Sequence, residues 1–117
     1  MVSGIHSSLS ALKAFSVKAQ VTASNAANAN TDGFKKSQVY MVESRLGGVE
    51  PKVEQINTEG TQILRDTPEG PQLVELSNVD LGEVASNLIV AQRGFEANLV
   101  ALRTQDEMTG SLMDIIG

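Results

Sequence analysis

Apolar and small side chains recur at heptad spacing at both ends of the chain, and this repeat constrains the fold more than any other feature. Between Ser3 and about Asn28 it comprises Ile5, Leu9, Leu12, Ser16, Ala19, Ala23 and Ala26. Near the C-terminus it comprises Leu81, Val84, Leu88, Ala91, Phe95, Asn98, Leu102, Gln105, Thr109, Leu112 and Ile116. Alternating intervals of three and four residues place such side chains on one face of a helix. The sequence therefore predicts helices over residues 3–28 and 79–116 that pack side by side.

Capping residues predict where both helices begin and end. Ser3 is a suitable N-cap, and residues 30–33 (Asn, Thr, Asp, Gly) favour the backbone conformations in which helices stop. Ser77, followed three residues later by Asp80, resembles a capping box with Asp in place of Glu. This pattern predicts that the second helix begins near Asn78.

The segment between the helices contains short β-prone runs separated by turns. The runs are residues 39–42, 49–56, 61–64 and 73–76. They predict a small antiparallel hairpin module of three or four strands, in which Pro51 marks an edge strand or a bulge. The expected fold class is mainly α with a small β module, its long terminal helices paired as an antiparallel or side-by-side coiled coil. The expected units are residues 1–31, 32–78 and 79–117.

The two expected helices differ in length. About 25 and 38 residues correspond to about 38 Å and 57 Å of helix. A pair within one chain therefore leaves part of the longer seam uncovered, which favours association with another subunit. Gly94 and Gly110 each weaken the second helix by about 1 kcal/mol relative to Ala, so packing must compensate or its end frays.

Charge and composition exclude several classes of function. The 117-residue chain carries 14 acidic and 9 basic side chains, with no cluster of cations, so nucleic acid and anionic lipid are not expected partners. The expected helices have opposite net charges, +2 over residues 1–31 and −4 over residues 79–117, because the first contains two Lys and no acid and the second six acids and two Arg. The chain has no Cys, no run long enough for a membrane span and no secretory signal. An acid-free, Ser-rich start is also compatible with an organellar transit peptide, although the first Arg is Arg45.

No residue pattern predicts catalysis or metal binding. His6 is the only His, and as part of a triad it would need a carboxylate from a distant segment, so an exposed polar residue is the simpler interpretation. Asp106 and Glu107 are adjacent helical residues that point in different directions, so a solvated helix face explains them better than a metal site. We therefore expect no catalytic, cofactor-binding or metal-binding residues and no small-molecule substrate.

Amides are dense where the first helix ends. Residues 25–34 include Asn25, Asn28, Asn30, Asp32, Gly33 and Phe34. Such amides can bond backbone groups where a chain changes direction, although an ordinary Asn-rich turn would have the same composition. Asn98 and Gln105 interrupt the second seam and could either fix the pairing register or face solvent.

Two of these stretches resemble the terminal motifs of the bacterial flagellar axial proteins, the rod and hook family. Residues 21–35 resemble the N-terminal motif of Asn, an aliphatic residue, Ala, Asn and then Asn-Thr-x-Gly-Phe or Tyr, except that Ala26 stands where the family more often has Ile or Val. Residues 74–81 and 88–98 resemble the C-terminal motif. The two motifs stand in the family's order, one toward each end of the chain.

The resemblance implies a place in the flagellum. It implies that the terminal helices form a coiled coil in the inner tube of the rod or hook and that the chain leaves the cell through the flagellar type III system. The expected location is the basal body, in the rod that spans the periplasm, with other rod and hook proteins and copies of this chain as partners. The short middle segment favours a proximal-rod protein, whereas the sequence of residues 74–81 is more similar to the hook and distal-rod type.

The sequence thus predicts a structural rod subunit that self-assembles into a tubular axial structure and transmits torque. The alternative is a soluble flagellar-associated binding module or assembly factor, and a small hydrolase would lack a plausible site. The residues expected to carry pairing along the helix seam are Ile5, Leu9, Leu12, Leu88, Phe95 and Leu102. Those of the C-terminal motif are Ser77, Asn78, Asp80, Gln92 and Asn98.

Overall fold

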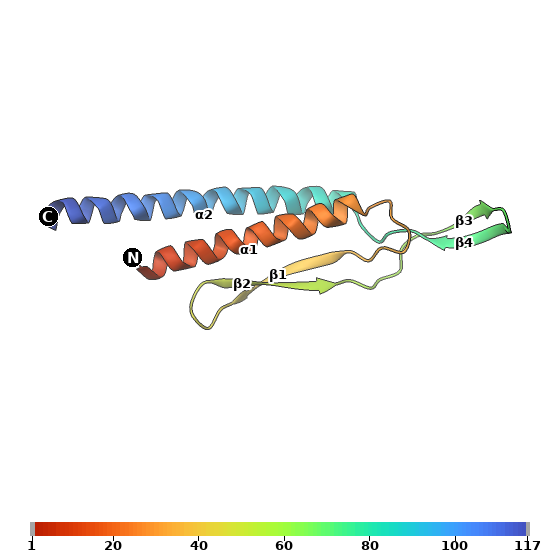
Figure 1. Ribbon diagram of the computed structural model, residues 1–117, viewed down its shortest axis with the longest axis horizontal. Coiled ribbons are helices and arrows are strands. Elements are labelled where there is room, and N and C mark those ends of the chain that lie inside the picture. Colours follow the sequence, from red (N-terminus) through yellow and green to blue (C-terminus); the bar gives the residue numbers. More distant parts are fainter. Residues whose placement is uncertain (1, 117) are drawn as a thin grey trace.

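A computed structural model describes the backbone of residues 2–116 and the side chains of residues 4–116. This part of the chain contains two long helices and four strands. The elements are α1 (Val2–Ala27), β1 (Ser37–Glu43), β2 (Val49–Gln55), β3 (Gln62–Thr67), β4 (Gly70–Glu75) and α2 (Leu81–Ile116). The helices pack side by side and run antiparallel, so that the N-terminal half of α1 lies beside the C-terminal half of α2 (Figure 1). The expected fold class, mainly α with a small β module, is confirmed.

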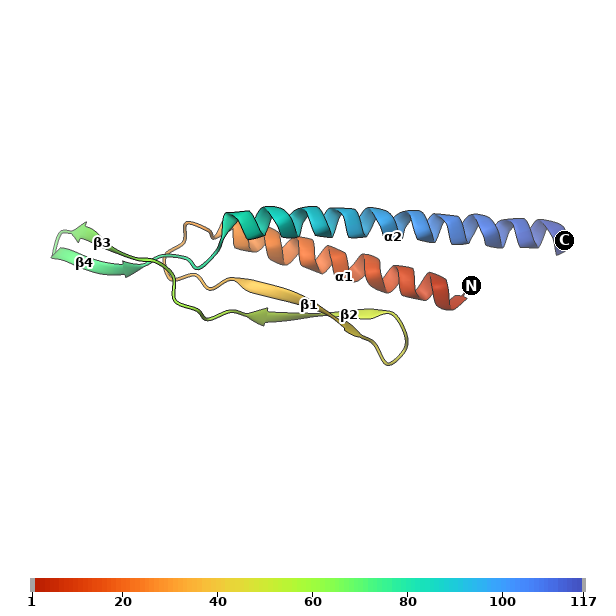
Figure 2. The same cartoon turned by 180° about the vertical axis from the view of Figure 1, so that it is seen from behind.

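The strands form two separate hairpins rather than one module. β1 pairs with β2 from Ser37 opposite Gln55 to Glu43 opposite Val49, and β3 pairs with β4 from Gln62 opposite Glu75 to Thr67 opposite Gly70. The β1–β2 hairpin lies along α1, whereas the β3–β4 hairpin projects beyond the helix pair (Figures 1 and 2). The chain between β2 and β3 runs through a polar junction described below. Pro51 lies in β2, which pairs only with β1, so the expectation of an edge strand is confirmed.

The second helix begins later than the capping pattern predicts, at Leu81 rather than near Asn78. Asp80 is its N-cap, because the Asp80 Oδ1 accepts a hydrogen bond of 2.8 Å from the Gly82 N–H and the Asp80 carbonyl accepts the Val84 N–H. The Ser77 hydroxyl instead accepts the N–H of Val79, two residues on. Ser77 therefore forms a turn that leads into the helix.

The folded chain is elongated and has almost no core. It measures 80 × 24 × 18 Å, and its radius of gyration of 20.7 Å compares with about 13 Å for a compact chain of this length. The buried apolar residues are Ala14, Val84 and Ala91, and none of the described large side chains is fully buried. The accessible surface is 8057 Å². A compact monomer of 12.4 kDa exposes about 6,100 Å², so about 2,000 Å² of additional surface faces solvent.

The two helices approach closely at Gly94. A Cβ atom at this position would lie 2.5 Å from two carbons of the Phe15 ring, so the ring packs directly against the α2 backbone. This contact supplies the packing that the sequence required to compensate for a glycine inside the helix. Nearer the N-terminus of α1, the Ser8 hydroxyl lies 3.5 Å from the Gln105 Oε1, which is the limit of a hydrogen bond.

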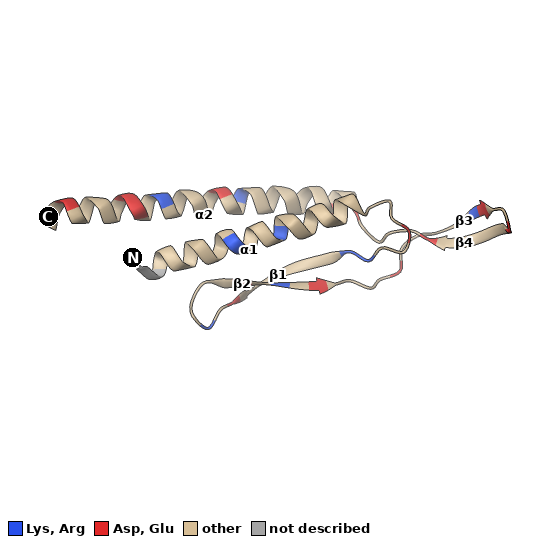
Figure 3. Ribbon diagram, in the orientation of Figure 1, with Lys and Arg blue, Asp and Glu red and all other residues tan. Residues whose placement is uncertain are grey.

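The opposite charges of the two helices do not pair with each other within the chain. Among residues 2–116 no ion pair joins α1 to α2, and the lysines of α1 have no carboxylate partner. The carboxylates of α2 are spread along its length (Figure 3). The expected electrostatic complementarity therefore does not hold the helix pair together through direct contacts. Neither described helix has the length and apolarity needed to cross a membrane.

Candidate assembly surfaces and polar junction

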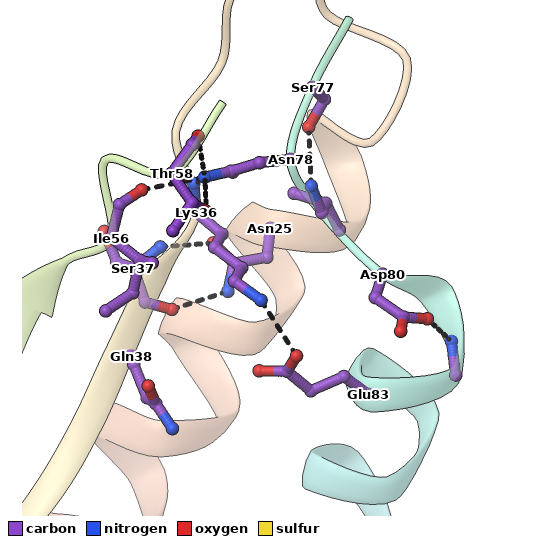
Figure 4. Close-up of polar contacts among 12 residues, drawn as sticks. Asn25, Lys36, Ser37, Gln38, Ile56, Thr58, Ser77, Asn78, Asp80 and Glu83 are labelled. Carbon is purple, nitrogen blue, oxygen red and sulfur yellow. Dashed lines mark hydrogen bonds and ion pairs between the residues drawn. The ribbon is translucent and has the colours of Figure 1, made fainter. Parts of the chain in front are cut away.

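Asn25, in the last turns of α1, binds the first residue of β1 through both atoms of its amide. The Asn25 Nδ2 donates to the Ser37 carbonyl at 2.7 Å, and the Ser37 N–H donates to the Asn25 Oδ1 at 3.0 Å (Figure 4). The side chain is buried, with 8% of its surface exposed. Asn25 therefore fixes the β1–β2 hairpin against the helix, and both of its polar atoms depend on this one partner.

Asn78 performs the equivalent function from the other side, immediately before α2. Its Oδ1 accepts the Lys36 N–H at 2.7 Å, and its Nδ2 donates to the Ile56 carbonyl at 2.8 Å and the Thr58 carbonyl at 3.1 Å (Figure 4). Asn78 thus holds Lys36, directly before β1, and Asn25 holds Ser37, the first residue of β1. Three stretches far apart in the sequence meet at this point.

Charged side chains surround the two amides. Lys35 forms an ion pair with Glu75, and Lys36 forms one of 2.9 Å with Glu83 in the first turn of α2. The hydrogen bond from Lys35 and a second from the Gly60 N–H lower the pKa of Glu75 below its ordinary value of 4.5. We call this cluster the polar junction; its members are Asn25, Lys35, Lys36, Ser37, Ile56, Thr58, Gly60, Glu75, Asn78 and Glu83.

The other residues expected at the corner are divided between the junction and the local turn. Asn28 bonds within its own turn, with its Nδ2 donating to the Ser24 carbonyl at 2.9 Å. Asp32 accepts hydrogen bonds from Arg65 of β3, the shorter at 2.6 Å, and Gly33 has a φ of 72°, which favours glycine.

Phe34 and Asn30 complete the expected corner set. Phe34 is half-buried, and its carbonyl accepts the Asn78 N–H at 3.3 Å, whereas Asn30 is exposed. Sequence reasoning missed Lys35, Lys36 and Glu75, because charged residues in a loop give no local signal of the partners that tertiary structure brings to them.

The polar residues of the C-terminal motif that lie inside α2 bond within the helix. The Gln92 Nε2 donates to the Glu96 Oε1 at 3.2 Å, and the Asn98 Nδ2 donates to the Gly94 carbonyl at 2.8 Å. Gln105 faces α1, as its approach to Ser8 shows. The structure thus places Gln105 between the helices and gives Asn98 a partner on its own helix.

The residues of the predicted seam, apart from Leu12, line two open apolar hollows between the helices. One hollow is lined by Ile5, Leu9, Leu99, Leu102, Arg103 and Asp106, and the other by Phe15, Ser16, Ala19, Leu88, Ala91, Gln92, Phe95 and Glu96. Leu12 is half-buried on α1. We call the surface that contains the two hollows the groove face.

The seam is displaced from the centre of the helix contact. Leu9 is 51% exposed and Phe95 39% exposed, whereas Ser8, Ala14 and Thr22 of α1 are buried. The cause is that α1 packs against α2 and against the β1–β2 hairpin at once. Its covered arc therefore includes small and polar residues, and the bulky seam is left at the margin.

The described residues contain no cluster of three or more His, Asp or Glu side chains suited to a metal ion. His6 is exposed and lies near the turn of the β1–β2 hairpin, beside Leu9 and Ser10. Extensive exposed apolar surface and a polar connection between helices and hairpins are features of a structural protein.

Comparisons with known proteins agree with this class. Residues 5–35 match the family described as flagella basal body rod protein, and residues 71–115 match the C-terminal region of the flagellar basal body rod FlgEFG proteins. The flagellar basal-body rod protein FlgG of Bacillus subtilis (strain 168) is 36% identical over 89 residues, which cover 74% of this chain and 31% of that protein. The flagellar hook protein FlgE of Helicobacter pylori (strain ATCC 700392 / 26695) is 48% identical over 42 residues, or 36% of this chain and 6% of that protein. FlgE of Escherichia coli (strain K12) is 40% identical over 42 residues, covering 36% of this chain and 10% of that protein.

The chain belongs to the family of flagellar basal-body rod proteins. Members of this family are structural components of the flagellum, located at its basal body. The chain spans about a third or less of the length of these curated relatives.

Proposed function

We propose that this chain is a subunit of the flagellar rod that self-assembles through α1 and α2 into a tubular axial structure. The observation that carries this proposal is the additional accessible surface of about 2,000 Å² on a chain without a core. Each partner in a stable protein interface buries about 800 Å². The additional surface is therefore sufficient for contacts with two neighbours.

The distribution of apolar residues on α2 supports contacts on several sides. Successive residues Leu88, Ile89 and Val90 are 38%, 60% and 49% exposed, and they point in three directions because each residue turns the helix by about 100°. Exposed apolar side chains on several sides of one helix indicate more than one association surface. One partner on one face would leave the others in water, so a repeating array fits α2 better than a closed dimer.

The polar junction supports a mechanical function. Torque passes along a rod only if its subunits do not deform at their connections. Asn25, Asn78 and the ion pairs of Lys35 and Lys36 connect both helices with both hairpins. We infer that the junction keeps these parts at fixed angles while the helices transmit load to neighbouring rod and hook proteins.

We further infer export by the flagellar type III system and a position among the short rod subunits. Residues 36–70, between the two matched regions, form only the hairpins and their connections, without an inserted domain. A short subunit of this kind suits the proximal rod.

The proposal is tested by isolating basal bodies from cells that express the chain and from cells that lack its gene. We expect the chain in the purified rod fraction at a fixed ratio to the other rod proteins, and loss of motility without it. A chain found only in the soluble fraction, with intact rods in its absence, would instead support an assembly factor that does not enter the rod.

A further inference from the structure

We propose that the groove face of one copy receives the outer ridge of α2 from a second copy, in a contact that is not reciprocal. The outer ridge consists of Ile89, Val100 and Glu107, on the side of α2 away from α1, and Glu96 lies between this ridge and the groove face. The inference rests on the proposed self-assembly and specifies which surfaces meet. It follows from shape, exposure, charge and area.

Shape requires a convex partner. Each of the two hollows of the groove face lies between α1 and α2. Two such faces opposed to each other would leave an unfilled space, and protein interfaces are packed as densely as protein interiors. A single helix surface, in contrast, fits between two helices as a ridge fits a groove. A symmetric contact of groove face with groove face is therefore disfavoured.

The outer ridge is the exposed convex surface that the same chain offers. Val100 follows the buried Ala91 by nine residues, which places it about 180° around the helix. Ile89 and Val100 are 60% and 62% exposed, and both follow the spacing of a packing stripe together with Glu107. These apolar side chains have no partner element on their own chain, because α1 lies on the opposite side.

Charge favours the same pair of surfaces. α1 carries Lys13 and Lys18 and no acidic residue. Lys13 is exposed and lines, together with Leu9, a hollow between α1 and the β1–β2 hairpin, so that Leu9 lies between Lys13 and the groove face. Within residues 2–116 neither lysine forms an ion pair. Glu107 on the ridge and Glu96 beside it supply carboxylates. Their ion pairs with Arg103 and Arg93 of the same helix are long, at 3.6 Å and 3.7 Å, and exposed, so these carboxylates are available to a second copy. A second copy would bring acids to the basic helix and so satisfy the charges that the single chain leaves unpaired.

Area and geometry then determine the kind of assembly. The additional surface of about 2,000 Å² covers one groove and one ridge per copy at about 800 Å² each. Because groove and ridge are different surfaces of one chain, each added copy presents a new groove or ridge to the next. Contacts of this kind continue without closing unless the rotation between copies forms a ring.

The test uses two variants of the whole chain, each defective on one surface. Leu9→Glu places a charge on the groove face, and Val100→Glu places one on the ridge; both positions are more than half exposed, so both variants should fold. Sedimentation velocity of the wild type should show species larger than a dimer that grow with concentration. Each variant alone should associate about 100-fold more weakly, because a carboxylate would have to be desolvated. An equimolar mixture should form one-to-one pairs and nothing larger.

Leu64→Glu provides the matched control, since Leu64 is 74% exposed on β3, away from both surfaces. It should associate like the wild type, and circular dichroism should show equal helix content in all variants. A Val100→Glu chain that still dimerises alone, a mixture that stays monomeric, or a wild type that is monomeric at every concentration would each overturn the groove-to-ridge contact. Presence of the wild-type chain in purified rods would still support the proposed function, and its absence there would overturn that function independently.

Discussion

Individual amides and glycines fix the connections of this molecule, because it has almost no apolar core to do so. Asn25 satisfies backbone groups of Ser37, Asn78 satisfies the backbone N–H of Lys36, and Gly60 lets two loops approach closely. Loss of one partner from a buried hydrogen bond costs about 1–3 kcal/mol, a large share of the stability of a small domain. Single substitutions should therefore destabilise the chain more in the polar junction than at exposed positions.

The first prediction compares two asparagines of the same corner. Asn25→Leu removes both bonds to Ser37 and leaves that backbone N–H and carbonyl without their partner, so the free energy of unfolding measured in urea should fall by roughly 1–3 kcal/mol for each group left unpaired. Asn28→Leu removes only contacts within an exposed turn and should cost less than about 1 kcal/mol.

The double variant connects this corner to function. Export needs an unfolded chain, whereas assembly needs the folded corner, so a chain with both Asn25 and Asn28 replaced by Leu should be secreted but fail to enter the rod. Normal motility with normal incorporation would show that the amides form a tolerant turn. Equal urea midpoints for the two single variants would contradict the stronger role given to Asn25.

The second prediction uses two glycines with different surroundings. A Cβ atom at Gly60 would overlap the Leu76 carbonyl oxygen, a backbone atom that cannot move independently, whereas at Gly110 nothing lies within 4 Å. Gly60→Ala should therefore lower the unfolding free energy by more than about 1 kcal/mol. Gly110→Ala should raise it by up to about 1 kcal/mol through helix propensity. Thermal unfolding followed by far-ultraviolet circular dichroism measures both, and destabilisation by Gly110→Ala would indicate a contact that the isolated chain does not show.

At the scale of elements, the sequence predicts the secondary structure well and its arrangement only in part. Heptads and turn residues fix both helices and all four strands to within a few residues, because local periodicity and backbone preference determine them. The start of α2 differs from the prediction because Ser77 and Asp80 are both good caps, and only the folded bonds distinguish them. The separation of the hairpins and the displacement of the seam depend on contacts between distant segments, which periodicity does not encode.

The third prediction concerns how acid affects the attachment of the β3–β4 hairpin. Bonds from Lys35 and Gly60 lower the pKa of Glu75, so they stabilise the folded state when Glu75 is charged. A lowered pKa means that this stabilisation is complete above the ordinary value of 4.5 and is lost as the pH falls through the lower, folded-state value. Hydrogen exchange of the Gly60 amide, corrected for the intrinsic rate, should therefore lose protection below about pH 4.5.

Glu75→Gln supplies the control for this pH effect. It retains an oxygen that can accept the Gly60 N–H but cannot ionise, so protection should be weaker and should not change over the same range. A Gln variant with the same pH profile as the wild type would assign the effect to another carboxylate.

At the scale of the whole molecule, an 80 Å chain with helices of 26 and 36 residues cannot cover its own longer helix. The last turns of α2 extend past the contact of Gln105 with Ser8 and Gly4. Met113, Ile115 and Ile116 are 68%, 82% and 84% exposed there. These turns expose much apolar surface and have no basic residue in the last turn to stabilise the helix end, so we expect their order to depend on neighbouring copies.

The fourth prediction follows from that dependence. At low concentration the amides of residues 108–116 should exchange close to the rate of an unfolded chain, while those of residues 84–98, beside α1, should be protected. Raising the concentration should slow exchange at the end of α2 if neighbouring copies cover it, because binding stabilises the ordered state by mass action. Replacing Met113 and Ile115 by Gln, which removes apolar surface but preserves helix length, should abolish this dependence on concentration without changing residues 84–98. Full protection of residues 108–116 in a monomer at every concentration would show that α2 is stable without partners, and self-assembly would then have to rest on the groove face and the outer ridge.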